Sequence, residues 1–468
     1  MEYLLRLFLI ALGCLVCLTP SYADDLVEIL NLALNNDPAL RQARAIYRAN
    51  HETMVQSRST LLPSLGLGGS TNRETSGPTD SIYITAPDPV TGEPSVRRVD
   101  DHSFRPGVNS HGWGVNLSQS LLNLSAWYTY QSARASDQAA AVDFAAQEQD
   151  LIYRVAIAYF DVLRAMDLLE TNLQEEEAAI TSLQQTQRRE EVGLDTIIDV
   201  NDSQAAYDLA RNTTILQRDI LASRFEALEA ITGQPHLDVN VLREDFPIMN
   251  VDGNLGEWES MAENNSLAIA LAEANLEASR HTLRARKSDH LPTISLNGRY
   301  GHFVTQPLLR EGIQIGGGAF DNTQLSLSIN VPLYSGGSIS SRRRAAEYNL
   351  IAAQESLELT HRQLTQNIRN AYRRVNTDVL VIAQRQQSII SAQSALDQTE
   401  LGVEVGQRNI VELLRARENL FRALRDYAEA RYDYVLDTLL LKQITGILTP
   451  QDVIDLNQWL TTPVNTVQ

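Results

Sequence analysis

The sequence is short of cysteine, lysine, aromatic residues and positive charge. Its 468 residues include two cysteines, Cys14 and Cys17, and of its 39 basic residues only Lys287 and Lys442 are lysine. With 58 acidic residues the net charge is -19, which excludes a nucleic-acid or anionic-lipid binder that works through bulk charge. Aromatic residues make up 6%, and there are only 24 Gly and 15 Pro, a composition that favours long helices over many small β units.

Residues 1–23 are predicted to form a secretory signal peptide. Arg6 precedes an apolar run over 7–18 that is too short to span a bilayer stably, and 21–23 supply a small-x-small cleavage site. Lipidation at Cys14 is the alternative, but the residues before it are in the wrong order for a lipobox. Cleavage after Ala23 would remove both cysteines, so core packing and assembly must hold the exported chain together. No later apolar run reaches the length of a membrane helix.

Short motifs recur at constant offsets along the chain. Residues 191–193 (Glu-Val-Gly) return at 404–406, and 231–233 (Ile-Thr-Gly) return at 444–446, both 213 residues later. Upstream, Leu62-Pro63 returns as Leu291-Pro292 at an offset of 229. The sequence therefore predicts two tandem repeats, with a shorter loop in the second.

Four long stretches contain neither Gly nor Pro: 115–192, 194–232, 338–401 and 407–445. In the first, apolar residues step by four and three, which is a seam for helix-on-helix packing. The seam consists of Leu151, Val155, Ala158, Val162, Met166, Leu169 and Leu173. Gly193 and Gly406 are predicted to be tight reversals, each opening a return helix of 39 residues. Each repeat would then hold a long helical hairpin, although an ordinary coiled-coil rod has the same pattern.

Four segments between the helices alternate apolar and polar residues with period two. Their apolar positions are Leu65 and Leu67; Trp113, Val115, Leu117 and Leu121; Ile294, Leu296 and Tyr300; and Leu325, Leu327, Ile329 and Val331. Each segment is about ten residues long, the length of a tilted membrane-spanning strand. A half-buried sheet in a soluble protein is the alternative. The long polar loops 74–110 and 304–322 favour an outer-membrane barrel.

Four strands cannot close a barrel, and open strand edges are not tolerated in lipid. The chain must therefore pool strands with copies of itself, giving eight strands from two copies or twelve from three. Twelve strands leave room for a water-filled lumen, which suits the Ser, Asn, Gly and Arg residues of the polar face.

Several motifs resemble those of the TolC-like outer membrane factors. They are Gln119 to Asn123 with Trp127, Ala158 to Leu163, Glu191 to Leu194 with Asp199-Val200, Val331 to Gly337, and Val405 to Val411. The resemblance covers nearly the whole mature chain. It implies a mixed α and β membrane protein: a homotrimer with a 12-stranded outer-membrane β-barrel, four strands per chain, continuous with a 12-helix periplasmic α-barrel.

The repeats and the resemblance together divide the chain as follows. After the signal peptide, the first repeat has short helices over 24–62, two strands over 63–122, and a long helix with its return helix over 123–233. An equatorial segment, 234–265, separates the repeats. The second repeat has a helix over 266–291, two strands over 292–334, and long and return helices over 335–446; 447–468 form a C-terminal equatorial segment.

The resemblance implies a passive exit duct in the cell outer membrane that extends into the periplasm. It would serve a tripartite efflux pump or a type I secretion system, with a periplasmic adaptor protein, an inner-membrane transporter and outer-membrane lipid as partners. The alternative is a structural or adhesive trimeric rod that transports nothing. We find no catalytic motif and expect no enzyme activity, cofactor, metal or nucleic-acid partner. Glu175 to Glu177 are expected to be a solvated helix face.

In the family, polar links between inner and outer coils close the periplasmic tip. The resemblance places the link's arginine at Arg408 and its acidic partner at Asp199, whereas the link's tyrosine and threonine positions hold Val403 and Ile198. The two acidic rings at the constriction fall on Glu412 and Arg415, which would pair with each other on one helix face. The expected adaptor-docking tips are Val192, Gly193 and Leu194, and Val405, Gly406 and Gln407.

Overall fold

The computed structural model describes residues 24–74, 82–88, 90–99, 108–310, 313–315 and 317–462. The predicted signal peptide, with both cysteines, and much of the predicted loop 74–110 lie outside these residues. The chain forms two compact units. The first comprises Gln138–Ala274 with the described parts of Met1–Asn50 and Gln354–Gln468, and the second comprises the described parts of His51–Asp137 and Asn275–Ala353.

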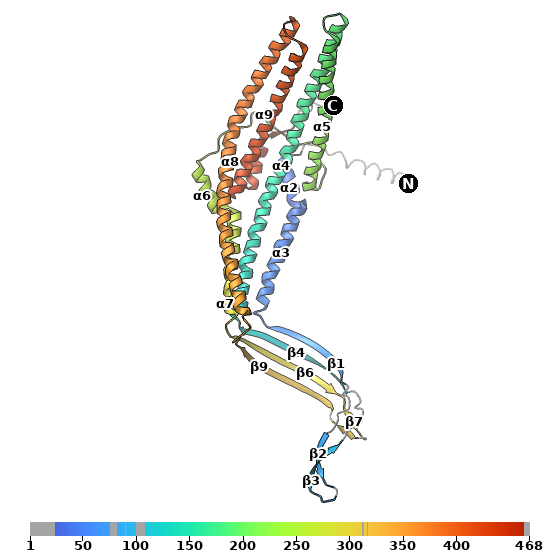
Figure 1. Cartoon of the computed structure of the whole chain (residues 1–468), viewed down its shortest axis with the longest axis vertical. Coiled ribbons are helices and arrows are strands. Elements are labelled where there is room, and N and C mark those ends of the chain that lie inside the picture. The colour runs from blue at the N-terminus through green and yellow to red at the C-terminus, as the bar shows by residue number, and fades with distance from the viewer. Residues whose placement is uncertain are drawn as a thin grey trace, which may run out of the picture. The chain divides into compact units, whose positions relative to one another are not determined.

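The helices come in pairs of nearly equal length (Figure 1). The shorter pairs have 11 and 22 residues, and the longer pairs have 68 and 67, and 36 and 36. Their bounds are α2 Leu26–Asn36 and α6 Leu255–Asn265; α3 Pro38–Ser59 and α7 Leu267–Ser288; α4 Leu124–Glu191 and α8 Ser338–Glu404; α5 Ile197–Thr232 and α9 Ile410–Thr445. A last short helix, α10, covers Pro450–Asn457.

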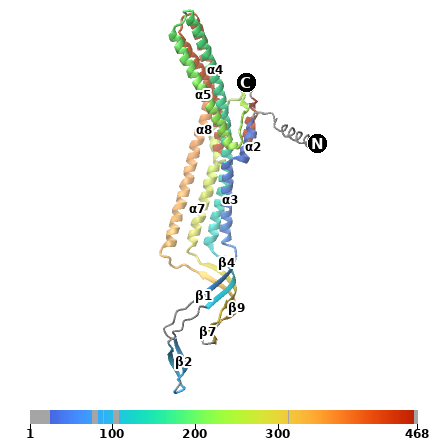
Figure 2. The ribbon, with the colours of Figure 1, turned by 90° about the vertical axis from the view of Figure 1, so that its right-hand side faces the viewer.

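The long helices fold back on themselves as two hairpins, α4–α5 and α8–α9 (Figures 1 and 2). The first 14 residues of α4 and the first 16 of α8 belong to the second unit, and the rest of both hairpins belongs to the first. The prediction that each glycine directly opens a 39-residue return helix is wrong. The return helices have 36 residues and begin at Ile197 and Ile410, because Thr196 and Asn409 act as N-caps. Both end at a left-handed glycine, Gly233 (φ 73°) and Gly446 (φ 81°).

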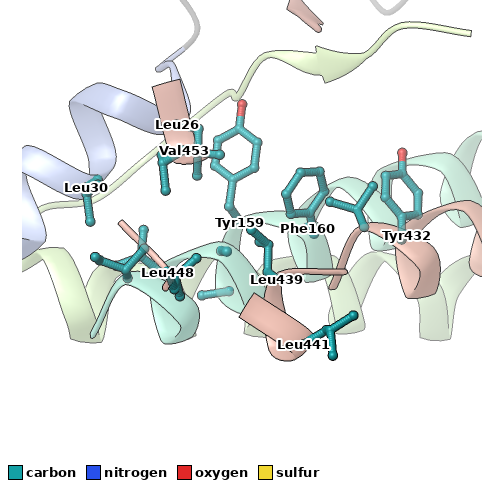
Figure 3. Packing of buried hydrophobic residues seen from close by; sticks show 14 of the residues in the cluster. Leu26, Leu30, Tyr159, Phe160, Tyr432, Leu439, Leu441, Leu448 and Val453 are labelled. Atoms are coloured by element: carbon teal, nitrogen blue, oxygen red, sulfur yellow. The ribbon is translucent and has the colours of Figure 1, made fainter. Parts of the chain in front are cut away.

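The main core of the first unit joins α2, α4, α9 and α10. Tyr159 and Phe160 of α4 are fully buried beside Leu26, Val453 and Leu439 (Figure 3). The phenol of Tyr159 donates to the carbonyl of Asn240 at 2.7 Å, so its polar end is satisfied inside the core. The predicted seam is confirmed in its first half, where Leu151, Val155, Ala158 and Val162 are all buried.

Short strands and ion pairs order the segments between and after the hairpins. β5 (Val241–Leu242) pairs with β10 (Leu460–Thr461). The carboxylate of Asp24 lies 2.6 Å from Nδ1 of His236, whose side chain is buried. In the same unit, the ammonium of Lys442 lies 2.5 Å from Asp452.

The second unit holds a four-stranded antiparallel sheet in the order β1-β4-β6-β9 (Figure 1). The strands are β1 Ser64–Glu74, β4 Val108–Leu122, β6 Thr293–Thr305 and β9 Gly318–Asn330. The predicted loops are shorter than expected. Strands β6 and β9 run into the predicted loop 304–322, which also contains β7 (Leu308–Arg310) and β8 (Ile313–Ile315). The predicted loop 74–110 contains a hairpin of β2 (Ile82–Pro87) and β3 (Pro94–Val99).

Candidate functional site

The sheet has one apolar and one polar face, as the alternation predicts. The register places Leu65, Leu117 and Leu296 on one face with Leu325 and Leu327, and several of these side chains are more than half exposed in a single chain. The opposite face carries Ser, Asn, Gly and Gln, among them Asn116, Ser118, Asn297, Gln324 and Ser326. An exposed apolar face on a sheet with an opposite polar face is typical of a strand set that separates lipid from water.

Aromatic residues lie on the apolar face toward the end of the sheet where β6 finishes and β9 begins. Trp113 and Tyr300 contact edge to face, with ring centroids 5.8 Å apart. On the same face, His302 is the register partner of Trp113, and its Nδ1 lies 2.7 Å from a carboxylate oxygen of Asp321. Along the strands the face thus changes from aliphatic residues to a level that carries aromatic and charged side chains together, as expected near the membrane–water interface.

The first hairpin tip is a short, well-bonded turn. Gly193 adopts the left-handed conformation (φ 79°), and the N–H of Leu194 donates to the carbonyl of Arg189 at 2.8 Å. The guanidinium of Arg189 binds Asp195 at 2.8 Å across the turn. Thr196 and Asp199 then form a capping box at the start of α5.

The second tip repeats this geometry with different side chains. Gly406 is left-handed (φ 73°), and the N–H groups of Gln407 and Arg408 both donate to the carbonyl of Gly402. The side chain of Asn409 accepts from the N–H of Glu412 at 2.9 Å and caps α9. A Cβ at Gly402 would lie 2.6 Å from Cγ of Arg408, so a larger residue at this position would displace the side chain of Arg408.

Both tips expose apolar side chains. Val192 and Leu194 are 70% and 68% exposed at the first tip, and Val405 is 61% exposed at the second. Large apolar side chains that protrude together from a turn are uncommon on a free surface and mark contact sites.

Of the four predicted gate residues, the structure brings two together. Arg408 donates from Nη1 to Glu412 at 2.7 Å, whereas Asp199 is used in the capping box with Thr196. The predicted pairing of Glu412 with Arg415 is not found. Helical side chains lean toward the helix N-terminus, so the carboxylate of Glu412 reaches back to Arg408 and Asn409. Arg415 is exposed on α9.

Two arginines of α9 that sequence reasoning missed link the second hairpin to the first. Arg425 binds Glu175 of α4 at 2.5 Å, and Arg417 donates to the carbonyl of Ala178 at 3.0 Å. The expectation that Glu175 is solvated is therefore wrong, since its side chain is only 19% exposed. The spacing of eight residues between the arginines places them on one helix face, which is the only sequence signal for this role.

A group of carboxylates lies between α8 and α9. Asp378 on α8 faces Asp437 on α9, and Arg374 donates to Asp437 at 3.1 Å. Burial, followed by the negative charge of Asp437, raises the pKa of Asp378 to about 7. Burial also raises the pKa of Asp437, and burial with the charge of Asp437 raises that of Tyr153 on α4. One proton is therefore shared within this group near neutral pH.

Within the described ranges, no three His, Cys, Asp or Glu side chains are grouped so that they could hold a metal ion. Among the helices of the same ranges, none combines the length and apolar character needed to cross a bilayer.

Comparisons with known proteins agree with this geometry. The family described as "Outer membrane efflux protein" matches residues 29–234 and 258–447. The chain is 33% identical over 464 residues to the outer membrane protein TolC of Vibrio cholerae, covering 98% of this chain and 99% of that one. It is 27% identical over 443 residues to the proteases secretion protein PrtF of Dickeya chrysanthemi, covering 93% and 91%.

Among solved structures, the chain resembles the CmeC outer membrane channel of Campylobacter jejuni with a TM-score of 0.72 and 18% identity. The match covers 93% of this chain and 90% of that one. The family match spans most of the chain, and the relative of 33% identity is matched over nearly its full length. The chain therefore belongs to the outer membrane efflux protein family and is an exit channel of the outer membrane.

Proposed function

We propose that three copies of the chain close a 12-stranded barrel in the outer membrane and a 12-helix tunnel in the periplasm. The observation that carries this proposal is the four-stranded sheet, whose end strands β1 and β9 each have one unpaired edge. Pairing β1 of one copy with β9 of the next would remove every open edge, as lipid requires. Three copies rather than two give a lumen wide enough to hydrate the polar face.

The two hairpin tips are proposed to be the periplasmic end of the duct. Their exposed apolar residues, Val192, Leu194 and Val405, suit docking to helices of a periplasmic adaptor protein. Gly193, Gly406 and Gln407 would shape the turns that present them. Names of relatives refer both to efflux and to the secretion of proteases, so the same duct would serve an efflux pump or a type I secretion system together with an inner-membrane transporter.

The first turns of α5 and α9 are proposed to form the gate. Glu412 and Arg415 of α9 would line the constriction together with Arg408, which precedes the N-cap of that helix, and Asp199 would meet Arg408 across coils in the assembled protein. The position of the family's linking tyrosine, Val403, instead packs into an apolar cluster around Leu396, Ile410, Leu413 and Leu420. Closure would thus depend more on apolar packing than on polar links.

We also propose that the chain arose by duplication of one sequence repeat, with the domain limits predicted above. The matched lengths of four helix pairs support this division. Cleavage of the signal peptide after Ala23 would make Asp24 the first residue. Its contact with the buried His236 supports a place for Asp24 in the mature fold.

Mass measurement in detergent and conductance in planar bilayers test the proposal together. We expect trimers without detectable folded monomer, and single-channel currents from the same preparation. A trimer that passes no current would instead support the structural or adhesive rod. Stable monomers that conduct would contradict the shared barrel.

A further inference from the structure

Three side chains interrupt the polar face of the sheet near the hairpin that joins β6 to β9. The face is otherwise built mainly from Ser, Thr, Asn, Gln and Gly, with Val108 at the end of β4, but here it carries Phe303, Phe320 and Arg299. On the four strands, the register places only one other charged residue on this face, Glu74 at the end of β1. Two phenylalanines beside a lone arginine are unexpected on a surface that otherwise suits water.

The two rings form a pair. Phe303 of β6 lies directly opposite Phe320 of β9 in the register. Their centroids are 5.9 Å apart and their planes differ by 29°, which is a stacked arrangement. Phe320 is 55% exposed even so, and it presents its ring to the space in front of the face.

Glycines let the ring of Phe303 lie flat against the sheet. A Cβ built at Gly112 on β4 would stand 2.5 Å from Cδ1 of Phe303, and one at Gly301 would stand 2.6 Å from Cε2. The ring therefore occupies the space that side chains at these two positions would fill. It forms part of the wall instead of projecting from it.

The guanidinium of Arg299 lies over this wall. Its Cζ is 5.3 Å from the centroid of Phe303, a cation–π distance. In the described part of the chain, Arg299 takes part in no hydrogen bond or ion pair, and Asp321, the nearest acid on β9 by register, points to the opposite face. The aromatic ring thus holds the guanidinium in place while its N–H donors stay available.

Filling space above the glycines accounts for Phe303, but not for the exposed ring of Phe320 or for an arginine without a counter-ion. We propose that Arg299, Phe303 and Phe320 form a binding site for flat aromatic anions, with the ligand ring stacked on Phe320 and its carboxylate or sulfonate bound by Arg299. This placement rests on the proposed function: the site then lies on the pore wall near the external mouth, and the trimer contains three such sites. It would favour the exit of aromatic acids.

Calorimetric titration of the intact protein in detergent tests the site with 2-naphthoate as the probe. Cyclohexanecarboxylate keeps the charge without the aromatic ring, and 2-naphthylmethylammonium keeps the ring and reverses the charge. We expect 2-naphthoate to bind about fivefold or more tightly than either, the size of one cation–π or charge-assisted contact. Equal binding of all three compounds would overturn the proposal.

Variants locate the binding. Arg299→Gln and Phe320→Leu should each weaken 2-naphthoate binding by about fivefold or more. Arg73→Gln and Tyr300→Phe, which lie on the apolar face, should leave it unchanged. Thermal unfolding of each variant verifies folding, and Arg299→Met, which keeps an unbranched side chain but removes the charge, replaces Arg299→Gln if that variant does not assemble. Unchanged binding in folded Arg299 and Phe320 variants would overturn the site.

Conductance of the same preparations separates this proposal from the proposed function. A protein that conducts but does not distinguish 2-naphthoate from its analogues refutes the site alone. A protein that binds 2-naphthoate selectively but passes no current supports the site and refutes the exit duct.

Discussion

Glu412, in the first turn of α9, accepts a hydrogen bond at 2.7 Å from Arg408, which lies just before the N-cap of this helix, so the acidic position of the tip has its counter-ion four residues away in the same chain. Both side chains are partly exposed, at 59% for Arg408 and 37% for Glu412. An exposed pair of this kind contributes only ~0.3–0.5 kcal/mol to stability. In the proposed trimer its larger effect would be electrostatic, because three copies of Glu412 near one axis would otherwise repel each other and attract cations.

Arg415 should weaken that attraction further. We expect Arg415→Asp to add a second ring of negative charge, to raise cation selectivity and to tighten block by multivalent cations. Bilayer recordings at low and high salt measure both, since salt screens the effect. Arg211→Asp, an equally exposed change on α5, is the control. Block that is the same in the Arg415 variant and the parent would mean that Arg415 does not face the pore.

Asp199→Ala should raise the open fraction of the channel modestly. The change removes the capping box with Thr196, which costs about 1 kcal/mol and frays the start of α5. It also removes the proposed partner of Arg408. Thr196→Ala separates the two causes in the same recordings. If Thr196→Ala also raises the open fraction, loss of the cap is responsible. If Arg408→Ala raises it and Thr196→Ala does not, loss of the link between coils is responsible.

Bulky substitutions at the tips should abolish export without preventing assembly. We expect this of Gly193→Trp and Gly406→Trp, since both turns have open space around the glycine but would no longer fit an adaptor. Gly92→Trp is a matched control, because Gly92 is also left-handed with nothing within 4 Å and lies in the β2–β3 hairpin. Export assays and detection of trimers in the membrane fraction measure the two effects. Export that survives both tip changes would place docking elsewhere.

The carboxylates between α8 and α9 should make stability fall as pH rises. Asp378 has a pKa of about 7 in the folded chain, against an ordinary value of 3.8, so the folded state binds more protons than the unfolded state between these pH values. The contribution is fully present below about pH 4 and is lost as the pH passes through about 7. Besides Asp437, the charges that face Asp378 are Asp433 on α9 and Arg374 on α8.

Thermal unfolding of the parent and of Asp378→Asn across this range measures the effect. The variant has no titratable group at this position, so its unfolding temperature should rise relative to that of the parent as the pH rises. Asp426→Asn, which removes a carboxylate paired with Arg385 between the same two helices, should show no such gain. Parallel pH profiles for parent and Asp378→Asn would contradict the shared proton.

The glycines that end the return helices should differ in their tolerance of alanine. Left-handed strain of about 1–2 kcal/mol applies to both Gly233→Ala and Gly446→Ala. Only at Gly446 would the new Cβ meet backbone, 2.2 Å from the carbonyl oxygen of Asn265. At Gly233 the nearest atom is Cβ of Asn36 at 3.6 Å. Gly446→Ala should therefore lower the unfolding temperature more, and equal losses would contradict this reading.

The elements that the sequence predicted well are those with strong local signals. Long stretches without Gly or Pro correspond to helices, and the alternation of Leu325 and Leu327 with Ser326 and Ser328 identifies a strand. The ends of the strands were missed because alternation fades where His302 and Asp321 replace aliphatic residues. A polar sequence there is typical of a loop, although the backbone pairing of β6 with β9 continues to Thr305 and Gly318.

Contacts between distant segments were not predictable. Arg425 lies 250 residues from its partner Glu175, and nothing in either local sequence identifies the pair. The pairing of Arg408 with Glu412 was missed for another reason. Both spacings, three and four residues, are compatible with a helix, and the choice depends on the cap at Asn409, which draws the carboxylate toward the helix start.

Scarcity of lysine, together with the ion pair of Lys442, offers a way to count subunits. Lys442 is held by Asp452 and is 34% exposed, whereas Lys287 is exposed in the last turn of α7. An amine-reactive dye used at low excess should modify Lys287 first, apart from the chain's own amino terminus. Single particles of the parent and of the Lys287→Arg variant are then photobleached, and the bleaching steps of each particle are counted. The parent should show one more step per chain than the variant, so the difference gives the number of chains in each channel.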